Sequence, residues 1–452
     1  MLRKPQLFGT DGVRGVAGRF PLDSETVGKL GRALGLILMR ENSSSRPEVL
    51  LGEDTRESSP WIALRLAGGL RASGVDVAHA GVITTPGAAF LTRHHGFAAG
   101  VMISASHNPF GDNGIKVLSS AGTKLPESLE LEIEETLENL PDSEISEPDL
   151  KSSPALLDEY LKFLESLVPA SNHLSRFRFV VDCANGASSA VAPEFLRRLG
   201  VQTRILNAEP DGRNINRECG SLYPRQMAAE TQSFQADLGV AFDGDADRAI
   251  FATRAARVLD GDYVIFAMAP FLQSQNALKG GAVVGTLMTN LGLELALKKR
   301  AIGVKRTPVG DKFVLEEMLR SGINLGGEPS GHIIFSDVSI AGDGMVTFLE
   351  MLRLLSETGA SADELMKGYR PFPQLIRNVR VKEKPALESV PEVAEALAHC
   401  RAELGDQGRV VLRYSGTEPL ARVMVEGEDA ATVEHHTAEI ATAIERTIGA
   451  AA

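Results

Sequence analysis

One pattern recurs three times along the chain and constrains its fold more than any other feature. A short apolar strand is followed by a turn rich in Gly, Asn or Thr, an amphipathic helix, and then Gly-Val at the start of a second strand. Strand–helix–strand units of this length form right-handed crossovers between parallel strands of one sheet. Three copies therefore predict three related α/β domains. The copies begin at Val49–Gly52, Phe179–Asp182 and Ala282–Gly285, and their second strands begin at Gly74, Gly200 and Gly303.

The last part of the chain, from about Gln374 to Ala452, has a different pattern. Three alternating runs predict strands at Ile376–Val381, Arg409–Arg413 and Ala421–Glu426, and a helix is expected over Ala431–Ile448. A chain of 452 residues is too long for one core. Breaks are expected at an acidic, Ser- and Pro-rich linker (141–154), near 256–261 and at the prolines of 369–373. We therefore predict four domains: residues 1–150, 151–257, 258–370 and 371–452.

Charge and cysteine content exclude several classes of partner. The net charge is −12, so no basic field attracts nucleic acid or an anionic membrane, although local arginines can still bind a small phosphorylated ligand. The three cysteines are far apart and form no CxxC motif, which predicts a reducing compartment without disulfides. No run is apolar enough for a signal peptide or a membrane span. We expect a cytoplasmic protein whose oligomeric state, a homodimer included, the sequence leaves open.

Ser106 lies at the end of an apolar run, Gly96–Ile103, that is expected to be a buried strand. His107, Asn108 and Pro109 follow, and the proline ends the strand. The run Asp112–Lys116 predicts a tight turn that returns a lysine toward the serine. A serine at the carboxyl end of a buried strand, with a cation near it, is placed to carry a covalent group. The alternative is a plain turn rich in Ser and Asn.

Three aspartates alternate along the chain directly after another apolar run, Leu238–Ala241. Asp243, Asp245 and Asp247 are two residues apart, so their carboxylates can curl around one hard cation. Mg²⁺ suits such a set and completes its octahedron with water and phosphate oxygens. The alternative is a solvated acidic turn or a set of helix caps. A metal held here needs a phosphoryl group as a further ligand, which would connect this loop to the serine.

A loop in the last domain carries groups that bind phosphate. Ser415, Gly416 and Thr417 offer hydroxyls and backbone N–H groups, and Arg413 and Arg422 can clamp a phosphate with two hydrogen bonds each. An ordinary hairpin turn with surface arginines is the equal alternative.

Two other glycine-rich runs present polar groups. Gly326–His332 offers a carboxylate, a hydroxyl and an imidazole, a set that suits vicinal sugar hydroxyls. Phe8–Gly15 presents one arginine, Arg14. His94 and His95 are expected on a helix surface, since no third ligand is spaced for a metal. With one motif per domain, the combination describes phosphoryl transfer to a phosphorylated sugar in a cleft between four domains.

Over nearly the whole chain these motifs resemble the α-D-phosphohexomutase superfamily. The resemblance implies three α/β domains with mixed sheets and a C-terminal α+β domain of TATA-binding-protein-like fold around a central cleft. The opening and closing motifs favour the branch that acts on glucosamine phosphate. The residues that carry the resemblance are Phe8–Gly15, Ile103–Lys116, Asp182–Gly186, Phe242–Arg248, Pro308–Lys312, Gly326–His332 and Arg413–Arg422.

The resemblance also implies a role for each candidate residue. Ser106 would be the phosphoserine, and its phosphoryl oxygen would complete the site of one Mg²⁺ ion. Lys116 would be the general acid/base, which needs a lowered pKa, and His107 would support the loop. The metal ligands would be Ser106, Asp243, Asp245 and Asp247; the phosphoryl group would lie among Arg14, Lys116 and Arg248; the sugar would meet Gly310, Asp311, Glu328, Ser330 and His332; and the distant phosphate would meet Arg413, Ser415, Gly416, Thr417 and Arg422.

The implied enzyme is an intramolecular phosphotransferase. It would interconvert glucosamine 6-phosphate and glucosamine 1-phosphate through a sugar 1,6-bisphosphate, which also serves as activator, and feed the synthesis of cell-wall precursors. The last domain would hinge near Pro371 to let the intermediate turn over and to exclude water.

Two departures from the family pattern bear on these expectations. Ala246 stands where Gly is frequent and is expected to be tolerated if its φ is negative. Pro329 replaces a Gln or Asn of the glucosamine branch, so an amide that could touch the sugar's 2-substituent is lost. The alternatives are a phosphomannomutase/phosphoglucomutase, a phosphatase with Asp243 as nucleophile, and a non-catalytic sugar-phosphate-binding protein.

Overall fold

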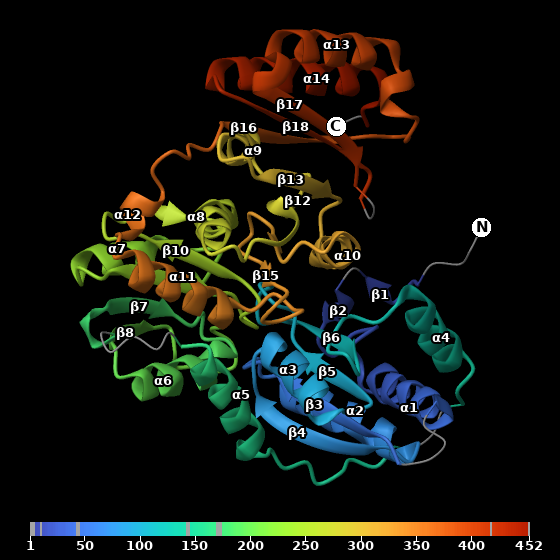
Figure 1. Ribbon diagram of the computed structural model, residues 1–452. Helices are drawn as coiled ribbons and strands as arrows, with labels where there is room; N and C mark the ends of the chain where they lie inside the picture. The colour runs from blue at the N-terminus through green and yellow to red at the C-terminus, as the bar shows by residue number, and fades with distance from the viewer. Residues whose placement is uncertain are drawn as a thin grey trace.

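The computed structural model of the protein describes residues 5–9, 11–41, 46–141, 145–168, 174–415 and 418–450. The strands form four sheets, which we use to define domains I to IV in chain order. In Figure 1 domain I is blue to teal, domain II green, domain III yellow to orange, and domain IV red.

Domain I contains a six-stranded sheet with the order β1-β2-β6-β5-β3-β4. Strands β3, β4 and β5 are parallel, and β6 pairs antiparallel with β5. Helices α1 and α2 pack on one another beside the sheet (Figure 1). The elements are β1 (Phe8–Gly9), β2 (Gly12–Val16), α1 (Ser24–Glu41), β3 (Glu48–Glu53), α2 (Ser59–Ala72), β4 (Asp76–Val82), α3 (Thr85–His95), β5 (Ala99–Ile103), β6 (Asp112–Ser119) and α4 (Glu127–Glu138).

Domains II and III repeat the central part of this plan. Their sheets have the orders β11-β10-β9-β7-β8 and β13-β12-β14-β15. The elements of domain II are α5 (Pro154–Ser166), β7 (Arg178–Asp182), α6 (Ser188–Leu199), β8 (Gln202–Leu206), α7 (Arg225–Ser233), β9 (Leu238–Phe242), β10 (Ala249–Ala252) and β11 (Val258–Leu259). Those of domain III are α8 (Gly261–Ser274), β12 (Ala282–Thr286), α9 (Leu291–Lys298), β13 (Gly303–Thr307), α10 (Asp311–Ser321), β14 (Leu325–Gly327), β15 (Ile333–Phe335), α11 (Gly344–Thr358) and α12 (Ala362–Leu365).

The three repeats predicted from the sequence are confirmed, and the prediction of mixed sheets with them. In each domain the first strand of the repeat (β3, β7 or β12) pairs parallel with the second (β4, β8 or β13) and on its other side with a third (β5, β9 or β14). A fourth strand (β6, β10 or β15) then returns antiparallel to the third. The turn between third and fourth strands is thus the same place in all three domains.

The expected tight turn at Asp112–Lys116 is wrong, because these residues form the first half of β6. Gly114 can lie inside a strand here because its backbone packs closely on the serine loop: a Cβ at Gly114 would be 2.6 Å from the carbonyl oxygen of Ser104. The lysine is still returned to the serine's vicinity, by the strand rather than by a turn.

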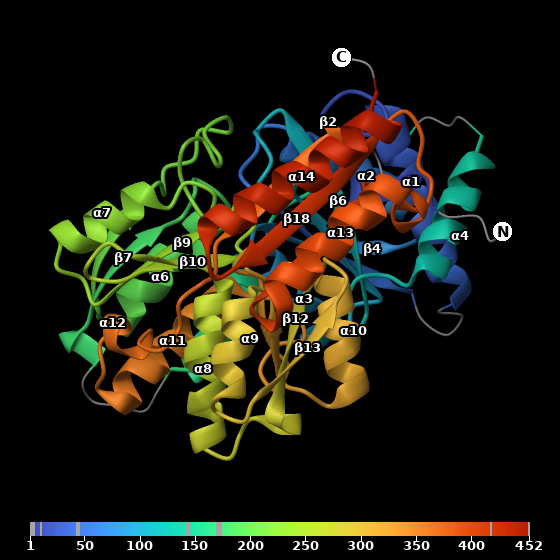
Figure 2. The same cartoon turned by 90° about the horizontal axis from the view of Figure 1, so that it is seen from above.

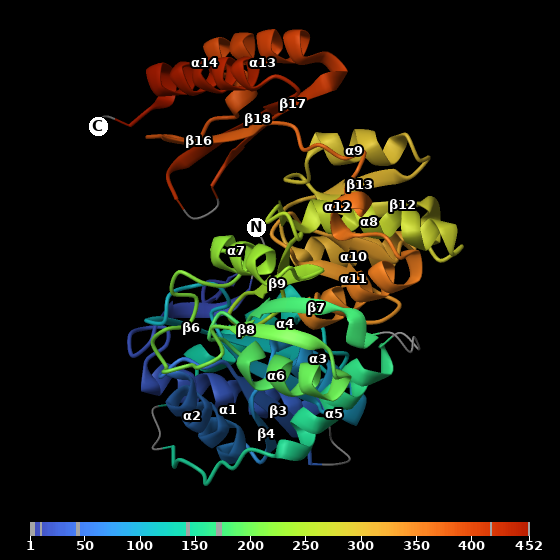
Figure 3. The ribbon, with the colours of Figure 1, turned by 90° about the vertical axis from the view of Figure 1, so that its left-hand side faces the viewer.

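Domain IV is a three-stranded antiparallel sheet, order β16-β18-β17, covered on one face by two helices. The predicted strands and closing helix are confirmed to within two residues. Figures 1 and 3 show both helices on the side of the sheet turned away from the other domains, and Figure 2 shows the two helices side by side above the strands. The elements are β16 (Gln374–Arg380), α13 (Pro391–Leu404), β17 (Gly408–Tyr414), β18 (Leu420–Gly427) and α14 (Ala430–Ile448).

The hydrophobic core is divided in a way that sets domain IV apart. One cluster of buried side chains includes residues of domains I, II and III, each of which also has a separate cluster, whereas the described residues of domain IV contribute only to a cluster of their own. The connection between domains III and IV is anchored by the side chain of Asn290. Its amide nitrogen donates to the carbonyl of Phe372 (3.0 Å), and its Oδ1 accepts from the N–H of Phe372 (2.8 Å). In the part of the chain that the structure describes, no helix is long and apolar enough to cross a membrane.

Candidate active site

The three repeated turns between third and fourth strands carry the serine motif, the aspartate motif and the motif predicted to bind sugar hydroxyls. They hold Ser106 between β5 and β6, the aspartates between β9 and β10, and Gly326–His332 at β14 and β15. These turns occupy equivalent positions in the three domains. The corresponding edges of the three sheets meet at one place, where hydrogen bonds join the turns.

The serine loop presents Ser106 in a strained backbone conformation. Its φ is +50°, in the left-handed region that non-glycine residues rarely adopt, and its side chain is buried. The N–H of Ser106 donates to Ser104 Oγ (2.9 Å), and its own Oγ donates to Asp243 Oδ2 (2.6 Å). His107 Nδ1 is 3.2 Å from Ser106 Oγ, and burial lowers the pKa of this imidazole. The serine hydroxyl therefore lies directly on the aspartate loop.

Arg56, which was not among the predicted residues, holds the serine loop in this shape. Its guanidinium is fully buried and paired with Asp54 (2.9 Å). It donates to the carbonyl oxygens of Ser106 (3.0 Å) and Asn108 (2.8 Å). Further bonds go to Pro109 and Asp112, and Asn216 of domain II also donates to the Ser106 carbonyl (2.9 Å). These donors satisfy the carbonyls of a loop that has no strand partner.

The aspartate loop is shaped by one glycine and one alanine. A Cβ at Gly244 would lie 2.4 Å from the carbonyl oxygen of Ser106, so only glycine lets the two loops touch. Ala246 has φ +58°. The expectation that this alanine is tolerated through a negative φ is therefore wrong; it is held in the left-handed region by its surroundings, and its methyl group is buried in the core.

The three carboxylates converge, as the sequence predicted. One oxygen from each of Asp243, Asp245 and Asp247 lies within 4.8 Å of the others. Burial, with the charges of the other two, raises the pKa of Asp243 well above its usual range. Burial opposes ionisation of Asp247 as well, but Lys116 and His332 hold its pKa well below the usual range. Oδ1 of Asp245 and Oδ1 of Asp247 are buried without a hydrogen-bond partner.

Lys116 reaches this centre from β6 and is surrounded by carboxylates. Its Nζ is 2.7 Å from Asp245, 3.3 Å from Asp11 and 3.7 Å from Asp247. Burial by itself would lower the pKa of Lys116, but the three carboxylates together raise it above its ordinary value. The lowered pKa expected for a general base is thus not found here, because the pKa of Lys116 is shifted in the opposite direction.

Arg14 and Arg248 both lie near the serine loop. Arg14 pairs with Asp11, and Arg248 Nε is 3.8 Å from Asp247. Both guanidiniums act on the His107 pKa, lowering it beyond the effect of burial. Nε of each arginine is buried without a hydrogen-bond partner, so both retain donors for an anion at this place.

Domain III contributes its predicted residues to the same centre. The N–H of Gly310, at the start of α10, donates to Glu328 Oε1 (3.0 Å). His332 lies with Nδ1 3.8 Å from Asp247 and Nε2 3.9 Å from Asp311. The Ser330 hydroxyl is buried without a partner. Burial alone would lower the pKa of His332, but the two aspartates raise it.

Asp11 and Lys124 form a bridge between domains I and III that the sequence reasoning missed. Lys124 Nζ lies 2.8 Å from Asp11 and 2.7 Å from Asp311. Burial would raise the pKa of Asp11, but Lys116, Lys124 and Arg14 hold it far below the usual range. Asp11 lies within the motif Phe8–Gly15. Its position three residues before Arg14 was the signal in the sequence that could have indicated an ion pair.

A cavity of about 290 Å³ lies between domains I and III at this centre. Its lining includes Asp11, Lys116, Asp247, Asp311 and His332, so residues from domains I, II and III face one space. Residues predicted from three separate motifs are thereby brought together.

The predicted phosphate-binding loop of domain IV stands apart from this centre. Arg413 on β17 and Arg422 on β18 are directly opposite each other, and burial together with Arg422 lowers the pKa of Arg413. Ser415 is buried, and its Oγ accepts from the N–H of Glu418 (3.3 Å). Gly416 and Thr417 lie outside the described residues. Among the residues that the structure describes, no hydrogen bond or ion pair joins this loop to the serine loop, and Figure 3 shows domain IV above domains I and II.

The chain matches four domain families in succession. They are phosphoglucomutase/phosphomannomutase alpha/beta/alpha domain I over residues 5–144, domain II over 158–256, domain III over 260–372, and the C-terminal domain over 377–443.

Relatives match over their full length. A phosphoglucosamine mutase of Solibacter usitatus is 47% identical over 445 residues, 98% of this chain and 99% of the relative. Another, from Koribacter versatilis, is 47% identical over 454 residues, 98% and 97% of the two chains.

Solved structures share the fold at lower identity. A putative phosphomannomutase from Thermus thermophilus has a TM-score of 0.78 at 23% identity, covering 98% of this chain and 100% of that one. An Aspergillus fumigatus N-acetylphosphoglucosamine mutase, in complex with GlcNAc-6P and magnesium, has a TM-score of 0.65 at 19% identity, covering 98% and 96%.

Proposed function

The chain belongs to the phosphoglucomutase/phosphomannomutase family of enzymes, and we propose that within it the protein acts as a phosphoglucosamine mutase. It would interconvert glucosamine 6-phosphate and glucosamine 1-phosphate. The observation that carries the proposal is the hydrogen bond of 2.6 Å from Ser106 Oγ to Asp243, which joins the nucleophile loop to the acidic loop. The identity of 47% to phosphoglucosamine mutases supports the choice of sugar.

The acidic loop fits a single Mg²⁺ ion. Three carboxylates converge within 4.8 Å, and the buried Oδ1 atoms of Asp245 and Asp247 have no other partner. Carboxylate oxygens are the ligands that Mg²⁺ prefers. Asp243, Asp245, Asp247 and a phosphoryl oxygen on Ser106 would hold the ion, which would supply positive charge to the phosphoryl group in transfer.

The transfer itself breaks one P–O bond and forms another. A sugar hydroxyl attacks the phosphorus of phosphorylated Ser106, the bond to Ser106 Oγ breaks, and the hydroxyl proton passes to a base. The resulting sugar 1,6-bisphosphate turns over and returns its other phosphoryl group to Ser106. Arg14 and Arg248 would neutralise the charge on the equatorial oxygens, which is the main catalytic task in phosphoryl transfer.

Lys116 is suited to the acid half of proton transfer. Because the surrounding carboxylates keep it an ammonium ion, it can donate a proton to an oxygen that loses the phosphoryl group. In the reverse step the same nitrogen would receive the proton from the attacking hydroxyl.

The sugar and its distant phosphate would be held from domains III and IV. Glu328, Ser330 and His332, with the loop at Gly310 and Asp311, would meet the sugar hydroxyls. Arg413 and Arg422, with Ser415, Gly416 and Thr417, would grip the phosphate that is not reacting. Domain IV has its own core, so rotation about the segment 371–373 would bring this loop to the serine without disturbing domains I to III.

Two organisational proposals accompany the function. We place the domains at residues 1–150, 151–257, 258–370 and 371–452, which the four matched families support. We also propose a reducing, cytoplasmic location, supported by the free thiols of Cys183, Cys219 and Cys400.

Replacing Ser106 with alanine tests the proposal. Conversion of glucosamine 6-phosphate, assayed with Mg²⁺ and catalytic bisphosphate, should fall by more than about 10³-fold, since the covalent step is lost. Ser119→Ala, at the other end of β6, is the matched control and should keep full activity. Retained turnover in Ser106→Ala, with release of free phosphate, would instead support a phosphatase that uses Asp243. Both oxygens of Asp243 already accept hydrogen bonds, from Ser106 Oγ and the N–H of Arg248, which speaks against that role.

A further inference from the structure

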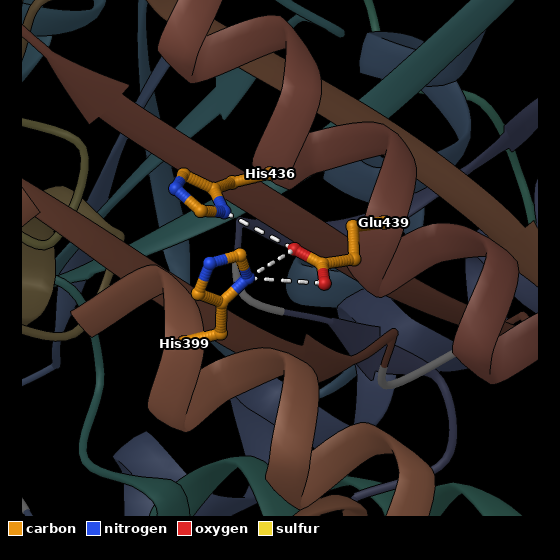
Figure 4. Close-up of side chains that lie close together, drawn as sticks. All are labelled: His399, His436 and Glu439. Atoms are coloured by element: carbon orange, nitrogen blue, oxygen red, sulfur yellow. Dashed lines mark hydrogen bonds and ion pairs between the residues drawn. The ribbon is translucent and has the colours of Figure 1, made fainter. Parts of the chain in front are cut away.

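A second group of metal-ligand side chains lies far from the proposed active site, on the outer helices of domain IV. His399 belongs to α13, and His436 and Glu439 belong to α14. One ligand atom of each lies within 4.8 Å of the other two. Figure 4 shows both imidazoles pointing at the carboxylate of Glu439 from opposite helices. From this arrangement we propose that domain IV binds one divalent transition-metal ion, of the Zn²⁺ class, between α13 and α14.

The distances suit such an ion. Nδ1 of His399 is 3.1 Å from each carboxylate oxygen of Glu439, and Nδ1 of His436 is 3.2 Å from Oε2. Ligand atoms at about 2.0–2.1 Å from a tetrahedral Zn²⁺ are about 3.3 Å from one another. The two nitrogen–carboxylate distances are therefore close to this value, and all three ligand atoms lie within 4.8 Å of one another.

The surroundings of His436 also favour a cation. Its side chain is fully buried, and each ring nitrogen faces a carboxylate: Nδ1 faces Glu439, and Nε2 is 3.1 Å from Glu403 without forming a hydrogen bond. A neutral imidazole has one N–H, so one of its nitrogens must turn a lone pair toward a carboxylate. A metal at Nδ1 would use that lone pair and leave the Nε2 proton for Glu403. Metal-bound histidines almost always have a carboxylate or carbonyl in that place.

The helices hold these groups on a rigid base. Flanking positions on both helices are buried in the core of domain IV, among them Ala396 and Cys400 on α13 and Val433 and Ile440 on α14. A site whose ligands come from packed helices needs little reorganisation to bind its ion. The imidazoles select against Mg²⁺, which prefers oxygen, and so distinguish this site from the aspartate loop.

The cluster offers its own matched control. His435 is adjacent in sequence, and its ring lies 5.3 Å from that of His436, yet it is not one of the three residues whose ligand atoms converge. A nonspecific imidazole patch would use His435 as readily as its neighbours, whereas the proposed site would not.

The test is Zn²⁺ titration calorimetry on the tag-free full chain, freed of metal by a chelator and kept in millimolar Mg²⁺. Asp243→Asn/Asp245→Asn serves as the background, so that the aspartate loop does not contribute. We expect one equivalent of Zn²⁺ with a Kd below about 10 µM and a rise in the melting temperature of domain IV. Co²⁺ in its place should give the visible bands of a four-coordinate site.

The variants decide the assignment. His399→Ala and Glu439→Gln, both at partly exposed positions, should abolish the binding of one equivalent of Zn²⁺. Glu403→Gln should weaken the affinity about 10-fold, and His435→Ala should leave the Kd within twofold of the background value. Absence of Zn²⁺ binding in the background variant would overturn the proposal. So would binding that survives His399→Ala, or that is lost equally in His435→Ala.

Discussion

Replacing Arg56 with lysine probes how the serine loop is held. The arginine donates five side-chain hydrogen bonds: one to Asp54 and four to the carbonyls of Ser106, Asn108, Pro109 and Asp112. A lysine ammonium has three donors and no planar fork, so at least two of these five hydrogen bonds are lost. All of this takes place where the guanidinium is fully buried.

The structure sets the size of the effect. A hydrogen bond from a charged donor contributes about 1.5 kcal/mol, so the loss of two costs about 3 kcal/mol, although Asn216 still donates to the carbonyls of Ser106 and Asn108. For a domain of this size, that corresponds to a fall of about 6–12 °C in melting temperature. A displacement of Ser106 by about 1 Å would also reduce kcat by about 10²-fold.

Scanning calorimetry and the mutase assay measure the two effects. Arg65→Lys is the control, since Arg65 is on α2 of the same domain, partly exposed, and donates to the carbonyls of Ile145 and Ser24. It should shift the melting temperature by less than about 3 °C. Arg56→Lys with an unchanged melting temperature and a kcat within twofold of the parent would refute the assigned role of Arg56.

Three other substitutions have defined outcomes. Gly244→Ala places a Cβ 2.4 Å from the carbonyl of Ser106 and should reduce kcat at least about 10²-fold, whereas Gly111→Ala, which meets nothing within 4 Å, should not change it. Ala246→Gly removes the strain of a φ of +58°, which stabilises the fold by about 1 kcal/mol, and loses a buried methyl group, which costs about 0.8 kcal/mol. The two nearly cancel, so the melting temperature should stay within a few degrees of the parent's, and a large fall would contradict the strain argument. Burial raises the pKa of Glu53 from 4.5 to about 7. The folded state therefore keeps a proton that the unfolded chain releases, and this stability is present below pH 4.5 and lost as the pH rises to about 7. Glu53→Gln should thus be more stable than the parent at pH 8, by on the order of 3 kcal/mol, and as stable as the parent at pH 4.5; a gain of the same size at both pH values would contradict it.

The repeats could be predicted from the sequence because each copy contains local signals for the ends of its helix and strands. Gly74 and Gly200 each lie between a helix and a strand, Gly303 begins β13, and the apolar runs before the helices became β3, β7 and β12. The antiparallel fourth strands were harder. At β6 the residues Asp112–Gly114 have turn composition, and only the close approach of Gly114 to Ser104 explains a glycine inside a strand.

The reacting groups of the site could be predicted from the sequence, whereas the residues that hold them in place could not. Ser106 and the aspartates stand directly after apolar strands, which is a local pattern. Arg56 is a single arginine in a loop, and its role depends on carbonyls about fifty residues away. The raised pKa of Lys116 depends on carboxylates from two domains, and the positive φ of Ala246 depends on packing. Neither has a signal in the local sequence.

The most direct test of the central claim is the conversion of glucosamine 6-phosphate to glucosamine 1-phosphate, with Mg²⁺ and a catalytic amount of sugar 1,6-bisphosphate. Glucose and mannose phosphates are assayed beside it. The account predicts a kcat/KM for glucosamine phosphate at least about tenfold higher, which is ~1.4 kcal/mol of transition-state discrimination, despite Pro329. A preference for glucose or mannose phosphate would contradict the assigned sugar, and release of free phosphate without any isomerisation would contradict the mutase itself.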